Sequence, residues 1–424
     1  MIDHEVLECF RGEYEDGREE SKLGMTGAIL MVTKAVISLS IFGFHSIFLR
    51  SGYLLGSIVS IIYMAGTGYG CIRASTLAAE VENSRNIKGY YVETYFELGE
   101  IIFPKNSNWR YLFGPALFVL NLLAMTSVSI AAFLALQMNI IQFLHFTQLG
   151  AKLLIYATVI VIILLIAEPE RLKFIAYVAL VPVIFLNLTC PTIALHELSG
   201  DKSVASGLKA IDFANLSQSI GYSISALEII GYILNIRRMI KDKRDFLKAC
   251  YISFSGSALL NIIPAVIMYM GFGLELQGVQ LYFKKYSNFN VIVFFDYLLN
   301  CSFLYTLPSK AYFSMELFEK TKLSRYILRD KDSNLIHWKV VCSRIFYFTC
   351  VALLTIPITD IQVVYAMTGV VVNSFLGLII PGLLGILRPI DIRDPDESRI
   401  TRVLDYCLIM LGMNAFLLYV YERT

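Results

Sequence analysis

The chain has 424 residues, of which 56% are hydrophobic and 17% charged, and its mean hydropathy is +0.63. Soluble chains are closer to half apolar and a quarter charged, so this composition excludes a soluble globular protein and indicates one that crosses a membrane many times. The formal net charge of +2 is too small to indicate a nucleic-acid partner.

Residues 1–26 are acidic and polar and are predicted to form an N-terminal tail. After this tail, windows of about 20 residues identify eleven apolar runs that are long enough to cross a bilayer as helices. The runs lie at 27–49, 54–79, 111–143, 151–167, 174–195, 213–236, 249–273, 289–317, 340–359, 361–387 and 403–422. Continuous apolar runs of this length predict a helical bundle rather than a β-barrel.

The distribution of lysine and arginine orients these helices. When the N-terminus is placed in the cytoplasm, 26 of the 36 Lys and Arg residues fall in cytoplasmic segments and 7 fall on the other side. This is the positive-inside bias of membrane proteins. We therefore expect a cytoplasmic N-terminus and, after an odd number of helices, an extracellular or lumenal C-terminus.

Motifs for bound nucleotides, haem or iron–sulfur clusters do not occur in the sequence, and the eight cysteines lack metal-ligand spacing. The sequence therefore predicts no cofactor, no metal site and no catalytic residue, and it favours a transporter over an enzyme. The absence of a selectivity-filter motif or a repeated ring of charge disfavours an ion channel.

Polar residues interrupt two of the predicted helices. The first span contains Ser38 and Ser40 near its centre, and the sixth contains four serines, two glycines and Glu228. Small hydroxyl residues and glycines suit an unwound segment whose backbone groups face a cavity. The two spans are five apart, as a five-plus-five inverted repeat requires, so we expect a site between them at the membrane centre. Close helix packing is the alternative explanation for the small residues.

The first span keeps Lys34, Phe48, Gly52 and Gly56 at the spacing "NLVKxxxGxGxLxLPxAFxxxGxxxG" of the first helix of the amino acid/auxin permease family, which it resembles. The segment "SALEIIGYILNIRRMIKDKRDF", which contains Glu228, is similar to the sixth helix of the same family.

Two later segments extend this resemblance along the chain. Residues 305–319, "YTLPSKAYFSMELFE", resemble the family's eighth helix. Residues 356–386 resemble its ninth and tenth helices, where Pro357, Gly369 and Pro381 recur. No single motif is specific, but the four occur in the correct order over nearly the whole chain.

The resemblance implies an all-α polytopic membrane protein with 11 transmembrane helices, arranged as a LeuT-like 5+5 inverted repeat plus one extra helix. Helices 1–5 would lie in residues 27–195, helices 6–10 in 213–387 and helix 11 in 403–422. The implied activity is secondary active transport of amino acids by alternating access.

The resemblance also implies a substrate site between spans 1 and 6. Backbone N–H groups of span 1 would hold the substrate carboxylate, and carbonyl and hydroxyl oxygens of span 6 would hold its amine. The implied substrate-binding residues are Ser38, Leu39, Ser40, Ile41, Tyr222, Ser223, Ser225 and Ala226. The family's two glycines are Ser38 and Ser40 here, and the serine Cβ atoms would crowd the carboxylate, which leaves open an altered substrate or a weaker activity.

Two charged residues are expected to govern ion coupling. Sodium-coupled relatives place an asparagine at the Lys34 position, so we expect the Lys34 ammonium to exclude sodium by bonding hydroxyls such as those of Ser302 or Thr306. The alternative interpretation of Lys34 is that its side chain snorkels to the cytoplasmic interface. Glu228 is the expected proton-linked group, because an ionised, unpaired carboxylate at the membrane centre is costly. The alternative interpretation of Glu228 is that its carboxylate stays ionised and only stabilises the bundle.

The favoured prediction is thus a sodium-independent, proton-coupled amino acid transporter. A transporter-like amino acid sensor that signals through its cytoplasmic tail and loops is the alternative. The expected partners are an amino acid, a proton and the lipid bilayer, with no nucleic acid. The plasma membrane and a vacuolar or lysosomal membrane both stay open, as do the substrate's identity, the transport direction and the oligomeric state.

Overall fold

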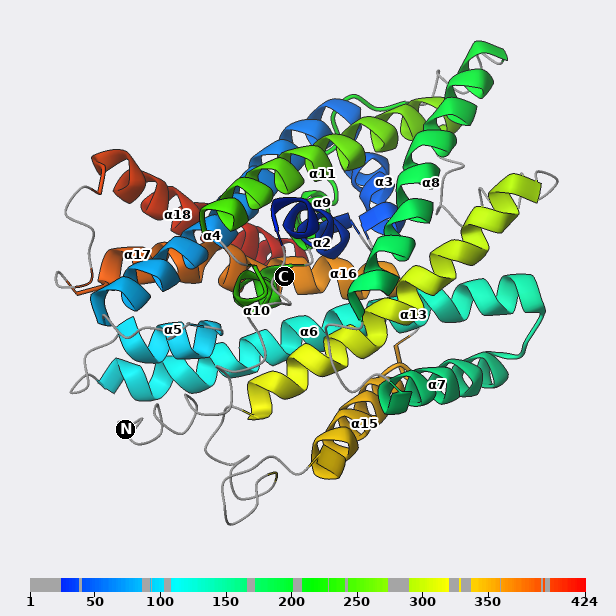
Figure 1. The fold of residues 1–424 in the computed structure, drawn as a ribbon. Helices are drawn as coiled ribbons and strands as arrows, with labels where there is room; N and C mark the ends of the chain where they lie inside the picture. Colours follow the sequence, from blue (N-terminus) through cyan, green and yellow to red (C-terminus); the bar gives the residue numbers. More distant parts are fainter. Residues whose placement is uncertain are drawn as a thin grey trace.

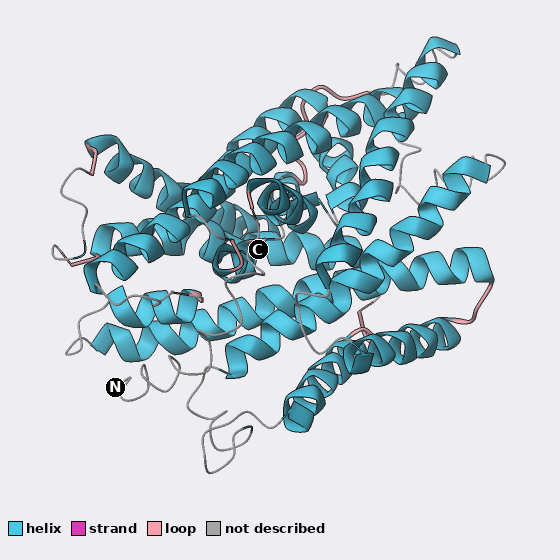
Figure 2. Cartoon of the chain, viewed as in Figure 1, coloured by secondary structure: helices cyan, strands magenta, loops and turns pink. Residues whose placement is uncertain are grey.

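The computed structural model describes most of the chain, and its regular elements are helices (Figure 2). The described residues are 24–37, 40–85, 92, 94–102, 108–165, 172–200, 208–227, 229–240, 243–273, 290–319, 328, 337–358, 360–389, 392 and 397–424.

The first half of the chain forms seven helices within this described part. They are α2 (Met25–Ile37), α3 (Ser40–Ser51), α4 (Tyr53–Arg85), the short α5 (Tyr95–Ile102), α6 (Asn108–Leu144), α7 (Gln148–Leu165) and α8 (Leu172–Gly200). The first predicted span thus corresponds to α2 and α3, which lie on either side of two residues outside the described part.

The second half is less regular. It contains α9 (Leu216–Ser225), the 3-10 turn η3 (Ile230–Tyr232), α10 (Ile233–Arg238), α11 (Lys243–Phe272), α13 (Asn290–Glu319), α15 (His337–Leu354), α16 (Ile361–Met367), the π-helical turns η5 (Thr368–Asn373) and η6 (Phe375–Ile379), α17 (Ile380–Leu387) and α18 (Arg399–Arg423). π-helical turns are rare and frequently accompany functional sites.

Gly52 forms the turn between α3 and α4. Its φ of +78° suits glycine, and a Cβ atom there would lie 2.6 Å from the carbonyl oxygen of Lys209. That carbonyl accepts a hydrogen bond from the N–H of Tyr53 at 3.2 Å, and the carbonyl of Ala210 accepts one from Leu54 at 3.0 Å. The glycine therefore lets the segment before α9 lie directly against the hairpin.

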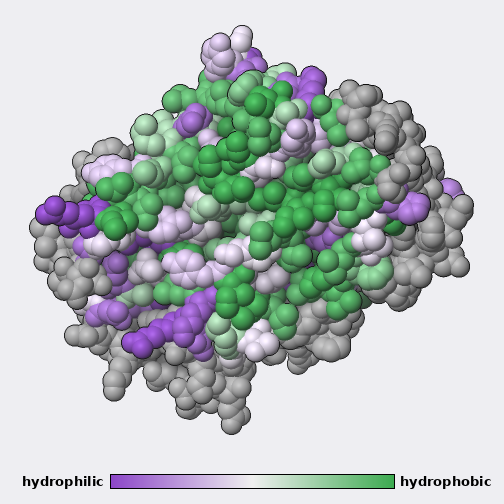
Figure 3. Space-filling view, turned by 90° about the horizontal axis from the view of Figure 1, so that it is seen from above, coloured by the Kyte–Doolittle hydropathy of each residue, from purple (hydrophilic) through white to green (hydrophobic). Residues whose placement is uncertain are grey.

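Six helical stretches in the described part are long and apolar enough to cross a membrane. They are Tyr53–Ser84, Phe113–Ile141, Leu216–Arg238, Arg244–Phe272, Ile361–Leu387 and Arg399–Arg423. The other predicted spans coincide with helices that are shorter or only partly described, so the count of eleven stays a prediction. Hydrophobic side chains cover much of the described surface in Figure 3, as expected where lipid replaces water.

The sixth span lies at the centre of the bundle. Its most apolar window is 100% buried within the protein, whereas that of α18 is 22% buried. Figure 1 shows α9 and α10 near the middle of the view, with α7 and α15 at one edge. α9 packs against α3, α4, α16 and η5. A polar, interrupted segment is thus shielded from lipid by other helices.

Candidate functional site

The sixth span is interrupted, as its sequence predicts. α9 ends at Ser225, and α10 begins only at Ile233. In between, Leu227 is not helical, and the N–H groups of Leu227, Ile230 and Tyr232 donate to carbonyls three residues back, at 3.4, 3.4 and 3.0 Å. These short turns replace the α-helical ladder, so some backbone groups at the interruption are freed from it. Glu228, in this interval, lies outside the described residues.

Ser225 is joined to α16 by a reciprocal pair of hydrogen bonds. Its carbonyl oxygen accepts from the Tyr365 hydroxyl at 2.8 Å, and its own hydroxyl donates to the Tyr365 carbonyl at 2.9 Å. The Asn373 amide donates to the same Ser225 hydroxyl at 3.4 Å. The carbonyl that leaves the helical ladder at the interruption is therefore satisfied from the tenth span, a partner that the sequence does not reveal.

The other predicted residues of this span are buried around the end of α9. The Ser223 hydroxyl donates to the Ser219 carbonyl at 2.8 Å and lies 3.4 Å from the Ser60 hydroxyl of α4. Ala226, the C-cap of α9, donates its N–H to the Tyr222 carbonyl at 2.9 Å. The structure thus brings Tyr222, Ser223, Ser225 and Ala226 together at the interruption.

The Tyr222 ring connects three elements on one side of the interruption. Its centroid lies 5.9 Å from that of Tyr365, and the Arg50 guanidinium of α3 lies 5.9 Å from it. Arg50 also donates to the Gln362 side chain of α16 at 3.1 Å. The ends of α3 and α9 and the start of α16 are therefore held together by one arginine and two aromatic rings.

Gly221 and Gly369 allow α9 and η5 to touch through their backbones. A Cβ atom on Gly369 would lie 1.8 Å from the Gly221 carbonyl oxygen, and one on Gly221 would lie 2.3 Å from the Ala366 carbonyl oxygen. For Gly221, the explanation by close helix packing is therefore correct, and unwinding is not needed to explain it.

The predicted residues of the first span are only partly described. Ser38 and Leu39 lie outside the described residues, and Ser40 and Ile41 belong to α3, where only their backbone is described. Their contact with a substrate carboxylate stays a prediction.

Lys34 lies in the last turn of α2 and is only 3% exposed. Its side chain is therefore covered by protein, which argues against snorkelling. On α13, the Thr306 hydroxyl donates to the Ser302 carbonyl at 3.0 Å. The Ser302 hydroxyl has no hydrogen-bond partner in the described part of the chain, so the suggested bond from Lys34 to Ser302 is absent. A cation site formed by these three residues stays a prediction.

Lys310 is a second buried lysine. Its position seven residues before the end of the predicted span 289–317 is typical of a snorkelling or a paired lysine, and its contacts favour pairing. It is 2% exposed, and its ammonium lies 3.5 Å from the centre of the Tyr232 ring. Phe313 stacks on the same ring, with centroids 5.1 Å apart, and the Tyr232 hydroxyl donates to the Ala35 carbonyl of α2 at 3.3 Å. A cation–π contact of this kind is stronger when it is desolvated. Lys310 thus connects α13 to Tyr232 of η3, directly before the sixth span continues as α10.

Buried ion pairs hold α10 on two sides. Arg237 donates to both carboxylate oxygens of Glu82 of α4, at 2.7 and 2.9 Å. Arg238 pairs with Glu316 of α13 at 2.7 Å, and Asn235 donates to the same carboxylate at 3.1 Å. The partner of Arg237 lies 155 residues away in the sequence. α10 is therefore clamped between α4 and α13.

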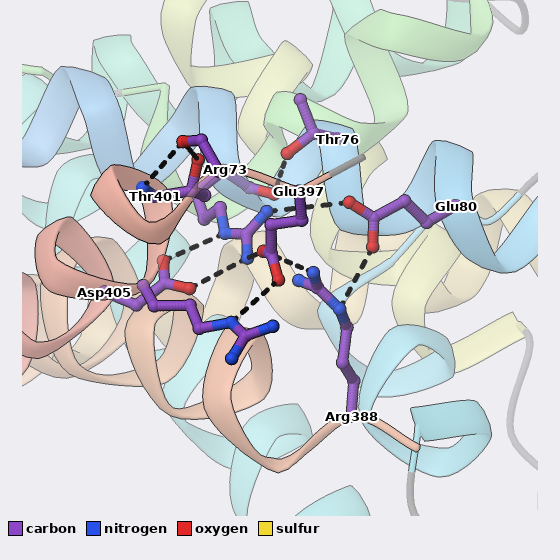
Figure 4. Close-up of polar contacts among 9 residues, drawn as sticks. Arg73, Thr76, Glu80, Arg388, Glu397, Thr401 and Asp405 are labelled. Atoms are coloured by element: carbon purple, nitrogen blue, oxygen red, sulfur yellow. Dashed lines mark hydrogen bonds and ion pairs between the residues drawn. The ribbon is translucent and has the colours of Figure 1, made fainter. Parts of the chain in front are cut away.

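A cluster of six charged side chains joins α4, α17 and α18 (Figure 4), and they are Arg73, Glu80, Arg388, Glu397, Arg402 and Asp405. Arg73 donates to both oxygens of Asp405, at 2.9 and 2.8 Å, and to Glu397 at 2.8 Å. Arg388 pairs with Glu397 and lies 3.2 Å from Glu80. Arg73 lies within the predicted span 54–79, near its end, and its charge is paired within the protein.

Glu397 precedes α18 and lies outside the predicted spans. Burial of its carboxyl raises its pKa, but the hydrogen bonds and charges of Arg388 and Arg73 lower it by more, so the pKa lies below its ordinary value of 4.5.

Comparisons with known proteins agree with this architecture. The model of the family described as "Transmembrane amino acid transporter protein" matches residues 21–423. A curated relative, the "Proton-coupled amino acid transporter-like protein pathetic" of Drosophila melanogaster, is 24% identical over 248 residues, which are 56% of this chain and 51% of that protein. The chain thus matches about half the length of this relative.

Two solved structures share the fold. The structure of MhsT in complex with L-phenylalanine has a TM-score of 0.61 at 16% identity, covering 94% of this chain and 98% of that one. A mutant of the Eremococcus coleocola manganese transporter has a TM-score of 0.51 at 14% identity, covering 93% and 86%. The chain therefore has a LeuT-like helical membrane fold.

Proposed function

Because this chain belongs to the transmembrane amino acid transporter family, we propose that it is a secondary active transporter that carries amino acids by alternating access, independently of sodium and coupled to protons. The observation that carries the proposal is the interrupted sixth span, which is fully enclosed by other helices. A bundle needs no broken, polar helix at its centre for stability alone, since an unbroken apolar helix would satisfy every backbone group. An enclosed interruption suits the binding of a polar substrate.

The proposed substrate site lies between the first and sixth spans. Backbone amides of Ser38, Leu39, Ser40 and Ile41 would hold the carboxylate of the amino acid. Its amine would meet oxygen atoms at the end of α9, within the set Tyr222, Ser223, Ser225 and Ala226. The Ser225 carbonyl accepts one hydrogen bond from Tyr365 and has a second lone pair, so it can accept from an ammonium as well.

Sodium independence is supported by the two buried lysines. The Lys310 ammonium of α13 lies 3.5 Å from the centre of the Tyr232 ring, and buried Lys34 precedes Ala35 of α2, whose carbonyl accepts a hydrogen bond from the Tyr232 hydroxyl. A sodium ion in that region would be repelled at short range, because a low-dielectric interior screens charge poorly. We include Ser302 and Thr306 in the proposed cation region as buried hydroxyl residues of α13.

Glu228 is the proposed proton-linked residue. The Drosophila relative is named as proton-coupled, and Glu228 belongs to the interval between α9 and η3 where the substrate is proposed to bind. Protonation would neutralise this interval in one conformation, and deprotonation on the less acidic side would complete the cycle. The N-terminus is proposed to be cytoplasmic, which puts the ion pairs of α10 on the cytoplasmic side.

The test is uptake by the purified protein in proteoliposomes. The twenty labelled amino acids are offered singly, with and without an imposed pH gradient, in sodium and in choline buffer. We expect at least one amino acid to accumulate with the pH gradient, at rates that are unchanged when choline replaces sodium. No uptake of any amino acid would contradict transport, and a steep dependence on sodium would contradict the proposed role of the lysines.

Variants of two carboxylates test the coupling. Glu228→Gln mimics the protonated form, so we expect it to lose accumulation against a gradient while it retains exchange of labelled for unlabelled substrate. The matched control is Glu100→Gln in α5, outside the predicted spans, which we expect to accumulate substrate normally. Accumulation by Glu228→Gln under a pH gradient alone would contradict the coupling role.

A further inference from the structure

The last helix of the chain, α18, ends against the first turn of α9. The backbone N–H of Ser217 donates to one carboxylate oxygen of Glu422 at 3.0 Å, and the Ser217 hydroxyl donates to the other. Asn215, at the N-cap position of α9, makes no side-chain hydrogen bond to the helix. Ser217 is the second residue of α9, and its N–H is one that a cap side chain ordinarily satisfies. Glu422 therefore caps α9 from a different helix.

The charge of Glu422 suits this position. The N-terminus of a helix carries a partial positive charge, so a carboxylate there is stabilising. Ser217 is 1% exposed, whereas Glu422 belongs to the exposed end of α18. The contact thus runs from the surface of the bundle to the buried beginning of the interrupted span.

The other end of α18 is fixed independently. Asp405 lies in the ion cluster of Figure 4, bonded to Arg73 of α4. Two glycines of α17 permit this approach: a Cβ atom on Gly385 would lie 2.3 Å from Asp405 Oδ2, and one on Gly382 would lie 2.5 Å from the Asp405 carbonyl oxygen. α18 is therefore held to α4 and α17 at one end and to α9 at the other.

We propose that Glu422 is a positioning residue, through which α18 sets the position of α9 and so of the substrate site at its end. This inference rests on the proposed function, which gives the position of α9 its importance. When α9 tilts during alternating access, its bonds to Glu422 break while α18 stays held by the ion cluster. The cap therefore favours the conformation in which α9 contacts Glu422 over one in which α9 has moved.

The test is amide hydrogen exchange of the segment 213–225 in the full chain reconstituted in lipid nanodiscs. Glu422→Ala removes both acceptors, so we expect exchange in this segment to rise by about two- to thirty-fold, the range of measured helix caps. Glu422→Gln keeps one acceptor oxygen, and a smaller rise is expected. Arg423→Ala is the matched control, since its guanidinium lies 5.6 Å from the Tyr419 ring of the same helix, and it should leave the segment unchanged.

Uptake kinetics add a readout that a merely structural role would not move. We expect Glu422→Ala to change the apparent KM for the transported amino acid at unchanged protein abundance, with no more loss of thermal stability than the removal of one helix cap produces. Unaltered exchange of 213–225 in Glu422→Ala overturns the inference whether or not the chain transports. Absent uptake by the unmodified chain overturns the proposed function, while hydrogen exchange still decides the role of Glu422. If Glu422→Ala does not fold, Glu422→Gln and Ser217→Ala decide it by the same measurement.

Discussion

Gly369 is the residue where the interrupted span and the tenth span come closest. Its recurrence in the family pattern has a physical reason, since a Cβ atom there would lie 1.8 Å from the Gly221 carbonyl oxygen. No side chain can rotate away to relieve such an overlap, because both partners are backbone. The contact between α9 and η5 therefore depends on the absence of one carbon atom.

Gly369→Ala should destabilise the protein by about 1–3 kcal/mol or more, since η5 must move away from α9. Thermal unfolding in detergent, followed by intrinsic tyrosine and tryptophan fluorescence, measures this. Gly256→Ala in α11 is the control, because nothing lies within 4 Å of the added atom. That change should be neutral or stabilising by about 0.5–1 kcal/mol, as alanine favours the helix. Equal Tm values for the two variants would refute the proposed backbone contact.

Among the elements, α10 depends on ion pairs for its position. It is six residues long, too short to be a stable helix by itself, and its Arg237 and Arg238 bond to helices on opposite sides. Glu82 also accepts a hydrogen bond from the Val92 N–H at 2.8 Å, so its carboxylate serves two partners. Removal of one member of a buried pair leaves an uncompensated charge.

Glu82→Gln and Arg237→Gln should therefore each cost about 3–5 kcal/mol of stability, and the double variant should cost clearly less than their sum. Glutamine at position 82 keeps an acceptor for Val92, which confines the change to the pair. A thermodynamic cycle from chemical or thermal unfolding yields the coupling. Additivity within about 0.5 kcal/mol would show that the two side chains act independently. The surface pair of Lys209 and Asp212 is the control, and its coupling should be much weaker because water screens both charges.

The sequence predicts the interruption of the sixth span but not what surrounds it. The interruption can be read locally, because serines, glycines and a glutamate disturb an otherwise apolar run. The partners of Ser225, Arg237 and Asp405 lie 140, 155 and 332 residues away, and periodicity within one chain carries no information about such pairs. For Lys310 the sequence leaves two alternatives open, since hydropathy cannot distinguish a lysine that snorkels to the interface from one covered by an aromatic ring.

At the scale of the whole molecule, pH acts on the cluster that joins α4, α17 and α18. The pKa of Glu397 is lower in the folded protein than its ordinary value of 4.5, because its arginine partners outweigh the effect of burial. A lowered pKa means that the contribution to stability is fully present above the ordinary value and is lost as pH falls through the folded value.

Glu397→Gln should therefore be less stable than the unmodified chain by a nearly constant amount from pH 7 to about pH 5, and the difference should shrink below about pH 4.5. We expect the constant part to be about 1.5–3 kcal/mol, the range for hydrogen bonds to charged groups. Tm values of both proteins across this pH range measure it. A difference that already vanishes at pH 6 would contradict the lowered pKa.

The complete enclosure of the sixth span also has a consequence for biosynthesis. This segment has the lowest mean hydropathy of the six long apolar stretches, 1.3, and yet it is the one most fully covered by protein. When its last residue, Arg238, is added to the chain, Tyr365 and Gly369 are still more than a hundred residues from being made. The nascent sixth helix must then enter the membrane before the later helices that cover it have been made, so earlier helices or the insertion machinery must shield it from lipid. Chains truncated before α16 would lack the partners of Ser225 and Gly221 and would leave this part of α9 uncovered.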